Sequence, residues 1–178
     1  EKIQYYFSGN YMGQEGMMAI RRDQLQRYSV TGKINAELFP WLHMNYSMKY
    51  MRKDYSKPTA MTDNTLYQNI SKRWPMEPTV DPNGYPMGNT IIRPSLYGGD
   101  NDSQTDWLYQ QFQVVIEPIK DWKIFGEINY KVIDAFTHTD YLKVPQMNVA
   151  GEPYSGDTWK TSKVTEGAER TNYFNANV

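Results

Sequence analysis

Apolar and polar side chains alternate without a break along residues 27–38. Side chains of a β-strand point to opposite faces in turn, so this segment predicts a strand with one apolar and one polar face. The apolar or small positions are Tyr28, Val30, Gly32, Ile34, Ala36 and Leu38, and the polar positions are Arg27, Ser29, Thr31, Lys33, Asn35 and Glu37.

The same alternation recurs in other parts of the chain. Residues 3–11, 42–50, 107–117 and 122–132 each predict a further strand, and a sixth strand is predicted to open at residues 172–178. The pattern therefore indicates an all-β chain of about five to six antiparallel strands.

The connections between these strands alternate in length. The short ones are residues 39–41 and 118–121, and the long ones are residues 13–24, 52–106 and 134–171. Tight periplasmic turns that alternate with long extracellular loops are typical of a transmembrane β-barrel, so the pattern predicts a segment of such a barrel.

The predicted strands are also long enough to cross an outer membrane. An apolar band about 25 Å tall, crossed at about 40° with a rise of ~3.3 Å per residue, needs about ten residues. Strands of soluble domains average ~5–6 residues. Aromatic rings stand toward both ends of the strands, as girdle residues would: Phe39, Trp41 and Trp122 near the short turns, and Tyr11, Tyr50 and Tyr130 toward the long loops.

Composition agrees with this prediction once the hydropathy is explained. Aromatic residues make up 15% of the 178 residues, yet mean hydropathy is only −0.75. A barrel has this combination because polar lumen positions alternate with apolar lipid-facing ones. The net charge of −1 gives no basic footprint for nucleic acid, and the absence of cysteine excludes disulfides and thiol nucleophiles.

The 52–106 loop is predicted to be functional, because loops of this length rarely serve as plain connections. A short helix is expected near residues 63–74, with Thr62-Asp63 as its N-cap and Pro75 after its end. Packing in the barrel mouth and filling of its own loop are equally open roles for this helix. The Asp81-Pro82-Asn83-Gly84 sequence predicts a turn.

Rings and carboxylates of the loops are the candidate contacts with substrate or partner. The rings could stack on sugars or hold peptides, although girdle positions and loop packing explain them as well. The acidic stretch 98–104 lacks the glycine and distal glutamate of a calcium loop, so a solvated loop is expected there. The candidate residues are Trp74, Tyr85, Tyr97, Asp100, Asp102 and Trp107.

No enzyme activity, cofactor or metal site is predicted. The two histidines, His43 on a polar strand face and His138 in a predicted loop, have no neighbouring serine and carboxylate that would complete a triad. Carboxylates such as Glu37 and Glu127 lie on polar strand faces, where solvation of a channel wall explains them.

The chain resembles the SusC/RagA-type TonB-dependent transporters of bacterial outer membranes. The similar residues are Tyr5 to Tyr11 with Gln14-Glu15-Gly16, Arg27-Tyr28, Asn69 to Pro75, Asp81 to Tyr85, and Ile116 to Ile124 with Gly126 to Tyr130. The resemblance implies a 22-stranded barrel with a plug domain in the outer membrane of a Gram-negative bacterium. It also implies a SusD-like lipoprotein lid, the TonB complex as energy source, and import of oligosaccharides or peptides.

The chain is expected to be only part of such a protein. Both ends fall within predicted strands, and the sequence contains no plug and no TonB-contacting segment. Five or six strands cannot close a barrel, so residues 1–178 are interpreted as a partial barrel domain whose apolar face contacts lipid.

Two alternatives remain open at this point. A soluble β-sandwich, such as a carbohydrate-binding module, would explain the aromatics but neither the strand length nor the alternating loops. A passive porin or adhesin barrel would share the whole pattern, and only the family resemblance argues against it.

Overall fold

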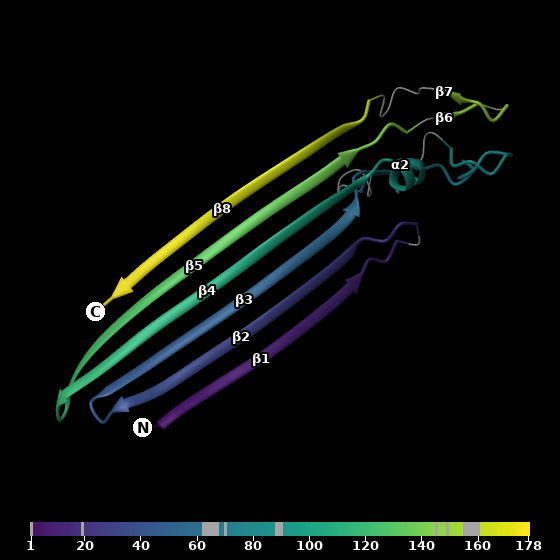
Figure 1. Cartoon of the computed structure of the whole chain (residues 1–178). Helices are drawn as coiled ribbons and strands as arrows, with labels where there is room; N and C mark the ends of the chain where they lie inside the picture. Colours follow the sequence, from purple (N-terminus) through teal and green to yellow (C-terminus); the bar gives the residue numbers. More distant parts are fainter. Residues whose placement is uncertain are drawn as a thin grey trace.

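Six long antiparallel strands form one sheet in the order β1-β2-β3-β4-β5-β8 (Figure 1). The computed structural model describes residues 2–18, 20–61, 68–69, 71–87, 91–144, 146–148, 150–154 and 161–178. Each long strand pairs with the one before it in the chain. The strands are β1 Lys2–Glu15, β2 Gln24–Phe39, β3 Leu42–Pro58, β4 Asp100–Ile119, β5 Trp122–Tyr141 and β8 Lys163–Asn177.

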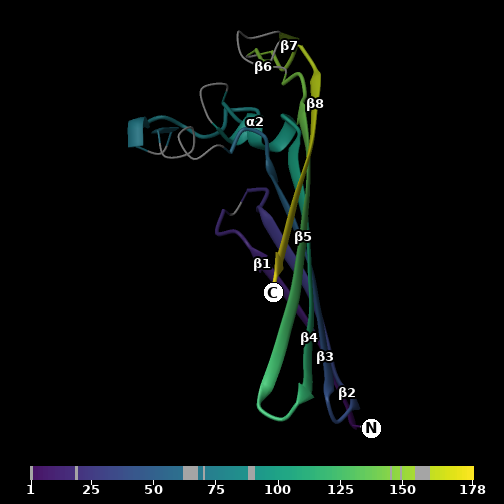
Figure 2. The ribbon, with the colours of Figure 1, turned by 90° about the vertical axis from the view of Figure 1, so that its left-hand side faces the viewer.

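The sheet is one layer thick, and it is not closed into a barrel (Figures 1 and 2). Strands β1 and β8 form its two edges. The remaining elements lie at one end of the sheet, where they belong to the long connections. They are α2 Ile92–Tyr97, β6 Gln146–Met147 and β7 Pro153–Tyr154, the last two paired with each other. The prediction of an all-β antiparallel chain is therefore confirmed.

Two-residue turns close the opposite end of the sheet. Pro40-Trp41 joins β2 to β3, and Lys120-Asp121 joins β4 to β5, with a register shift beside each turn. Asp121 adopts a positive φ of 70°, and its amide donates to the Glu117 side chain at 3.1 Å. Both short connections therefore lie where the alternation predicted them.

The strands run further toward the long loops than predicted. The connections are residues 16–23, 59–99 and 142–162 instead of 13–24, 52–106 and 134–171. The sixth strand begins at Lys163, so the prediction that it only opens near residue 172 is wrong. The alternation of apolar and polar residues stops where both faces become polar, but backbone pairing between the strands continues without it.

The long connection 59–99 is anchored to the strand ends by backbone bonds. The Thr59 amide donates to the Gly99 carbonyl at 3.0 Å, and its hydroxyl donates to the Asp140 carbonyl at 2.7 Å. The Leu142 amide donates to the Gly98 carbonyl at 2.9 Å. Most of the buried side chains belong to the long connections or to the strand ends next to them, and among them are Pro58, Ala60, Met61, Arg93, Ser95, Thr139 and Val144.

The helix predicted near residues 63–74 falls in large part outside the described residues. Gln68, Asn69, Ser71 and Lys72 are helical, whereas the predicted N-cap Thr62-Asp63 is not among the residues described. The predicted turn is confirmed, because Gly84 has a φ of 84° and its amide donates to the Asp81 carbonyl at 2.9 Å.

Candidate functional site

The six strands share two faces of opposite chemistry. Cross-strand pairing is free of register shifts except beside the two short turns, so alternate residues stay on one face across the whole sheet. One typical row pairs Tyr5, Ile34, Tyr46, Phe112, Ile128 and Ala176 in turn. The row one residue further along pairs Tyr6, Lys33, Ser47, Gln111, Asn129 and Asn175.

The row that contains Ile34 belongs to the face with apolar side chains. We call the part of this face between the short turns and the row of Val132 the apolar band. Its large side chains face outward without a covering layer among the described residues, with exposures such as 74% for Phe7 and 65% for Phe174. In other proteins, uncovered apolar surfaces of this extent are typical of contacts with a partner, a ligand or a membrane. Members of the band are Ile3, Tyr5, Phe7, Val30, Ile34, Met44, Tyr46, Met48, Leu108, Phe112, Val114, Ile116, Ile124, Ile128, Tyr130 and Phe174.

The opposite face, which we call the polar face, carries amides, hydroxyls and lysines. The Asn45 amide donates to Gln113 at 2.9 Å across β3 and β4. The Lys131 ammonium lies 5.3 Å from the centre of the Tyr109 ring. A shallow hollow of about 530 Å³ runs over this face, and among its lining residues are Thr31, Lys33, Ser47, Lys49, Tyr109, Gln111, Asn129, Lys131 and Tyr173.

A charged row ends the apolar band on the side of the long loops. The Arg52 guanidinium donates to both carboxylate oxygens of Asp106, at 2.8 and 2.9 Å, and Tyr50 donates to one of them at 2.8 Å. These bonds, those from Arg52 above all, hold the pKa of Asp106 at about 2 against the opposing effect of burial. The row continues to Asp134, which pairs with Arg170 at 3.4 Å.

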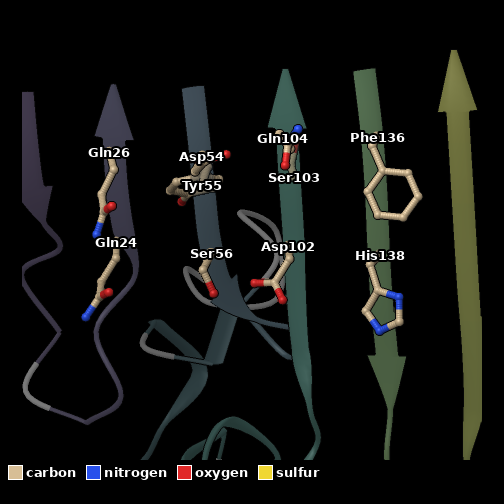
Figure 3. A pocket seen from close by; sticks show the side chains of 10 residues that line it. All are labelled: Gln24, Gln26, Asp54, Tyr55, Ser56, Asp102, Ser103, Gln104, Phe136 and His138. Carbon is tan, nitrogen blue, oxygen red and sulfur yellow. The ribbon is translucent and has the colours of Figure 1, made fainter. Parts of the chain in front are cut away.

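Beyond the charged row, the same side of the sheet forms a polar hollow of about 360 Å³ (Figure 3). Gln24, Ser56, Asp102 and His138 lie opposite one another on four adjacent strands. Asp54 and Phe136 line the next part of the hollow, two residues closer to the apolar band. The hollow therefore offers hydrogen-bond donors and acceptors and the rings of Tyr55 and Phe136, and the charged row separates it from the apolar band.

Each ring nitrogen of His138 contacts the carboxylate of another residue. Nδ1 lies 3.0 Å from Glu166 on β8, and Nε2 lies 3.2 Å from Asp140 on its own strand. The Glu166 contact in particular raises the pKa of His138 above its usual value of 6.5, because both contacts favour the protonated ring.

We predict that the pairing of β5 with β8 is more stable in mild acid. Because the folded-state pKa of His138 is raised, its contribution is complete below the unfolded-state pKa and disappears as pH rises through the folded value. Amide protection of residues 163–166 should therefore be higher at about pH 5.5 than at about pH 8. His138→Gln should abolish this difference and His43→Gln should preserve it; an unchanged difference in His138→Gln would contradict the assignment.

The six predicted contact residues do not converge on one site. Trp74, Tyr85 and Tyr97 lie in the 59–99 connection, where they are exposed. Asp100 and Asp102 lie in β4, so their placement in the long loop is wrong. Trp107 lies in β4 as well, in agreement with the strand predicted at residues 107–117. The same strand contains most of the acidic stretch 98–104, which is therefore not a solvated loop.

Only one of these six residues lines a hollow described above. Asp102 lines the hollow of Figure 3, together with His138, which lies in β5 and not in the predicted loop. Asp100 forms an ion pair with Arg21 of the β1–β2 connection. A second guanidinium nitrogen of Arg21 donates to the Leu96 carbonyl at 2.7 Å. Trp107 lies on the polar face, between Met51 and Ile133.

The formal charge of −1 conceals a separation of charge between the two sides of the sheet. On the side of the sheet that carries the apolar band, the half toward the long connections has mainly acidic side chains among its charged residues. The acidic residues are Glu15, Asp54, Asp100, Asp102, Asp106, Asp134, Asp140 and Glu166, and the exceptions are Arg52 and Arg170. The polar face carries most of the strand lysines. Composition cannot reveal this separation, because it emerges only when strand parity and register are combined.

In the described ranges, no group of three or more His, Asp or Glu side chains is placed to hold a metal ion. Nor does any helix within them have the length and apolar content that crossing a bilayer requires.

Comparison with known proteins gives no match: no family model, no curated protein and no solved structure matches the chain. The resemblance to SusC/RagA-type transporters therefore stays a prediction from the sequence.

Proposed function

We propose that the chain forms part of the wall of an outer-membrane β-barrel, with the apolar band toward lipid and the polar face toward the lumen. The observation that carries this proposal is the apolar band itself, which crosses all six strands and lies opposite a polar face of equal extent. A wall between lipid and water needs this division, because adjacent residues of each strand meet different solvents.

The two ends of the sheet support the same orientation. Two-residue turns lie at one end and the long connections at the other, as in barrels with periplasmic turns and extracellular loops. In this orientation the 59–99 connection, with Trp74, Tyr85 and Tyr97, faces the outside of the cell. The charged row then lies at the outer rim of the membrane, where ion pairs regain contact with water.

The family resemblance extends the proposal from the barrel wall to a transport function. We propose that the barrel is a TonB-dependent transporter of the SusC/RagA type, which imports oligosaccharides or peptides together with a SusD-like lipoprotein lid. In such a transporter, parts of the protein other than this wall would contact the TonB complex. A passive porin would share the wall, and its uptake would not depend on TonB.

A soluble β-sandwich is the less favoured alternative. It needs a second sheet against the apolar band, whereas the other paired strands of the described chain, β6 and β7, have two residues each.

Site-directed labelling tests the wall directly, because the chain has no cysteine of its own. We expect a cysteine in Ile128→Cys to react in native membranes only with a lipid-soluble maleimide. The adjacent Asn129→Cys should react with a water-soluble one and serves as the matched control. Equal reaction of both with the water-soluble reagent would rule out a lipid-facing band.

The transport role needs a separate measurement. Uptake of a growth substrate by the intact host should stop when TonB is deleted, if the barrel is energised. Uptake that continues unchanged would favour a porin, while leaving the wall itself in place.

A further inference from the structure

The polar face concentrates cations on β2, β3 and β5. We define the cationic track as Arg27, Lys33, Lys49, Lys53 and Lys131. Arg27 and Lys53 lie directly opposite each other, and Lys49 and Lys131 flank the Tyr109 position from either side. Like charges placed opposite each other on one face of a sheet destabilise it, so this arrangement has a cost.

Among the described residues, one polar-face carboxylate lies in the rows of the track: Glu169 on β8, in the row of Arg27 and three strands away from Lys53. On β1 to β5, whose residues are all described, no polar-face position from the row of Lys33 to the row of Arg27 holds a carboxylate. The polar-face carboxylates of these strands, Glu37, Glu117 and Glu127, lie nearer the short turns. Among the described residues, moreover, none of the four lysines forms an ion pair.

We propose that the cationic track binds carboxylate groups of the solute that passes through the barrel, so that the transporter selects acidic oligosaccharides or acidic peptides. This inference rests on the proposed function, because it places the polar face in the lumen. Rings of lysine and arginine give anion selectivity to other membrane pores by the same electrostatic means.

The side chains around the track suit a solute that carries hydroxyl or amide groups besides its carboxylate. Three of the track lysines, Lys33, Lys49 and Lys131, line the hollow of about 530 Å³. The polar side chains that line it with them are Thr31, Ser47, Gln111 and Asn129. Hydroxyl and amide side chains both donate and accept hydrogen bonds, as sugar hydroxyls and peptide groups require. The exposed Tyr173 adds a ring at the β8 side of this hollow.

The choice of lysine favours a passing ligand over a permanent structural contact. Lysine is a flexible, strongly hydrated point charge, whereas arginine makes rigid paired bonds to carboxylates. The other side of the sheet shows this contrast, since Arg52 holds Asp106 through two bonds. A transport path needs binding that is weak enough to release its ligand, and four of the five track residues are lysines.

The test compares affinities of the protein as its host produces it, purified in detergent. The anionic probes are tetragalacturonate and tetraglutamate, and the neutral probes are maltotetraose and tetraglutamine. We expect an anionic probe to bind, with an affinity that falls as salt rises from about 0.05 to 0.5 M. The double variant Lys49→Gln/Lys131→Gln should weaken this binding by about tenfold or more, because charge-assisted bonds are replaced by neutral ones.

A matched variant controls for a general loss of charge. Lys123→Gln removes a polar-face cation close to a short turn, outside the track, where Lys123 lies 3.6 Å from Glu117. It should leave the affinity for the anionic probes unchanged. Tetragalacturonate and tetraglutamate together decide whether the carboxylate belongs to a sugar or to a peptide.

Three outcomes would separate failure of this inference from failure of the proposed function. Equal affinity of the Lys49→Gln/Lys131→Gln and natural proteins for every probe would overturn the inference, provided that the variant folds in the outer membrane. Carbodiimide cross-links between track lysines and carboxylates of the same protein would overturn it too, because a protein segment would then occupy the track. Absence of the natural protein from the outer membrane would instead overturn the proposed function.

Discussion

Phe112→Arg should destabilise the membrane-inserted protein by about 2–4 kcal/mol. Phe112 lies in the middle row of the apolar band, with rows of the band on both sides along the strand. In the proposed orientation, a guanidinium there faces the hydrocarbon core, where it loses hydration and gains no partner. The expected measurement is a urea titration of the protein folded into phospholipid vesicles, monitored by its tryptophan fluorescence.

Gln113→Arg is the matched control, because Gln113 follows Phe112 on the same strand, points to the polar face and pairs with Glu127 outside the cationic track. The added charge would then meet water, and stability should change by less than about 0.5 kcal/mol. Equal losses in the two variants would show that the faces do not have different solvents.

Gly99→Ala should have the second largest effect, by loosening the anchor of the 59–99 connection. Gly99 has a φ of 95°, and an added Cβ would lie 2.5 Å from the Asp140 carbonyl oxygen. The backbone conformation alone disfavours a side chain by about 1–3 kcal/mol, and the contact with Asp140 adds to this. Both Gly99 and Asp140 accept bonds from Thr59, so the shift should release the start of the connection as well.

Hydrogen exchange of the Thr59 and Leu142 amides measures this release, because they donate to the Gly99 and Gly98 carbonyls of the anchor. Exchange of both amides should be about tenfold or more faster in Gly99→Ala, in proportion to the larger open population. Gly32→Ala is the control, since a Cβ at Gly32 meets nothing within 4 Å. Exchange in Gly99→Ala no faster than in the natural protein would contradict the role of Gly99.

The strands and the short turns could be predicted because their signals are local. Alternation between neighbouring residues shows the strand and its two faces, as at residues 27–38, and a few residues between two such runs define a turn. The strand ends toward the long loops could not be found in this way. Asp100, Asp102 and His138 pair through their backbones in a region where both faces are polar, so their side chains give no periodic signal.

The candidate sites depended on information that no single strand contains. Arg27 and Lys53 become neighbours only through the register of β2 with β3. The hollow of Figure 3 likewise joins residues from four strands, and His138 lies beyond the residues whose alternation predicts a strand. The role of Gly99 depends on its contact with Asp140, a residue of a different strand.

The anchor at Thr59 and Gly99 also bears on the order in which the sheet assembles. Two-residue turns let the β2–β3 and β4–β5 hairpins form from contacts close in sequence, at a small loss of chain entropy. Joining β3 to β4 is slower, because it must first close the long 59–99 loop. The Thr59–Gly99 bond lies at the base of that loop, beside the pair Pro58–Asp100. The two hairpins are therefore expected to behave as early folding units. Pairing of β3 with β4 is then expected to start at the anchor and to proceed toward the short turns.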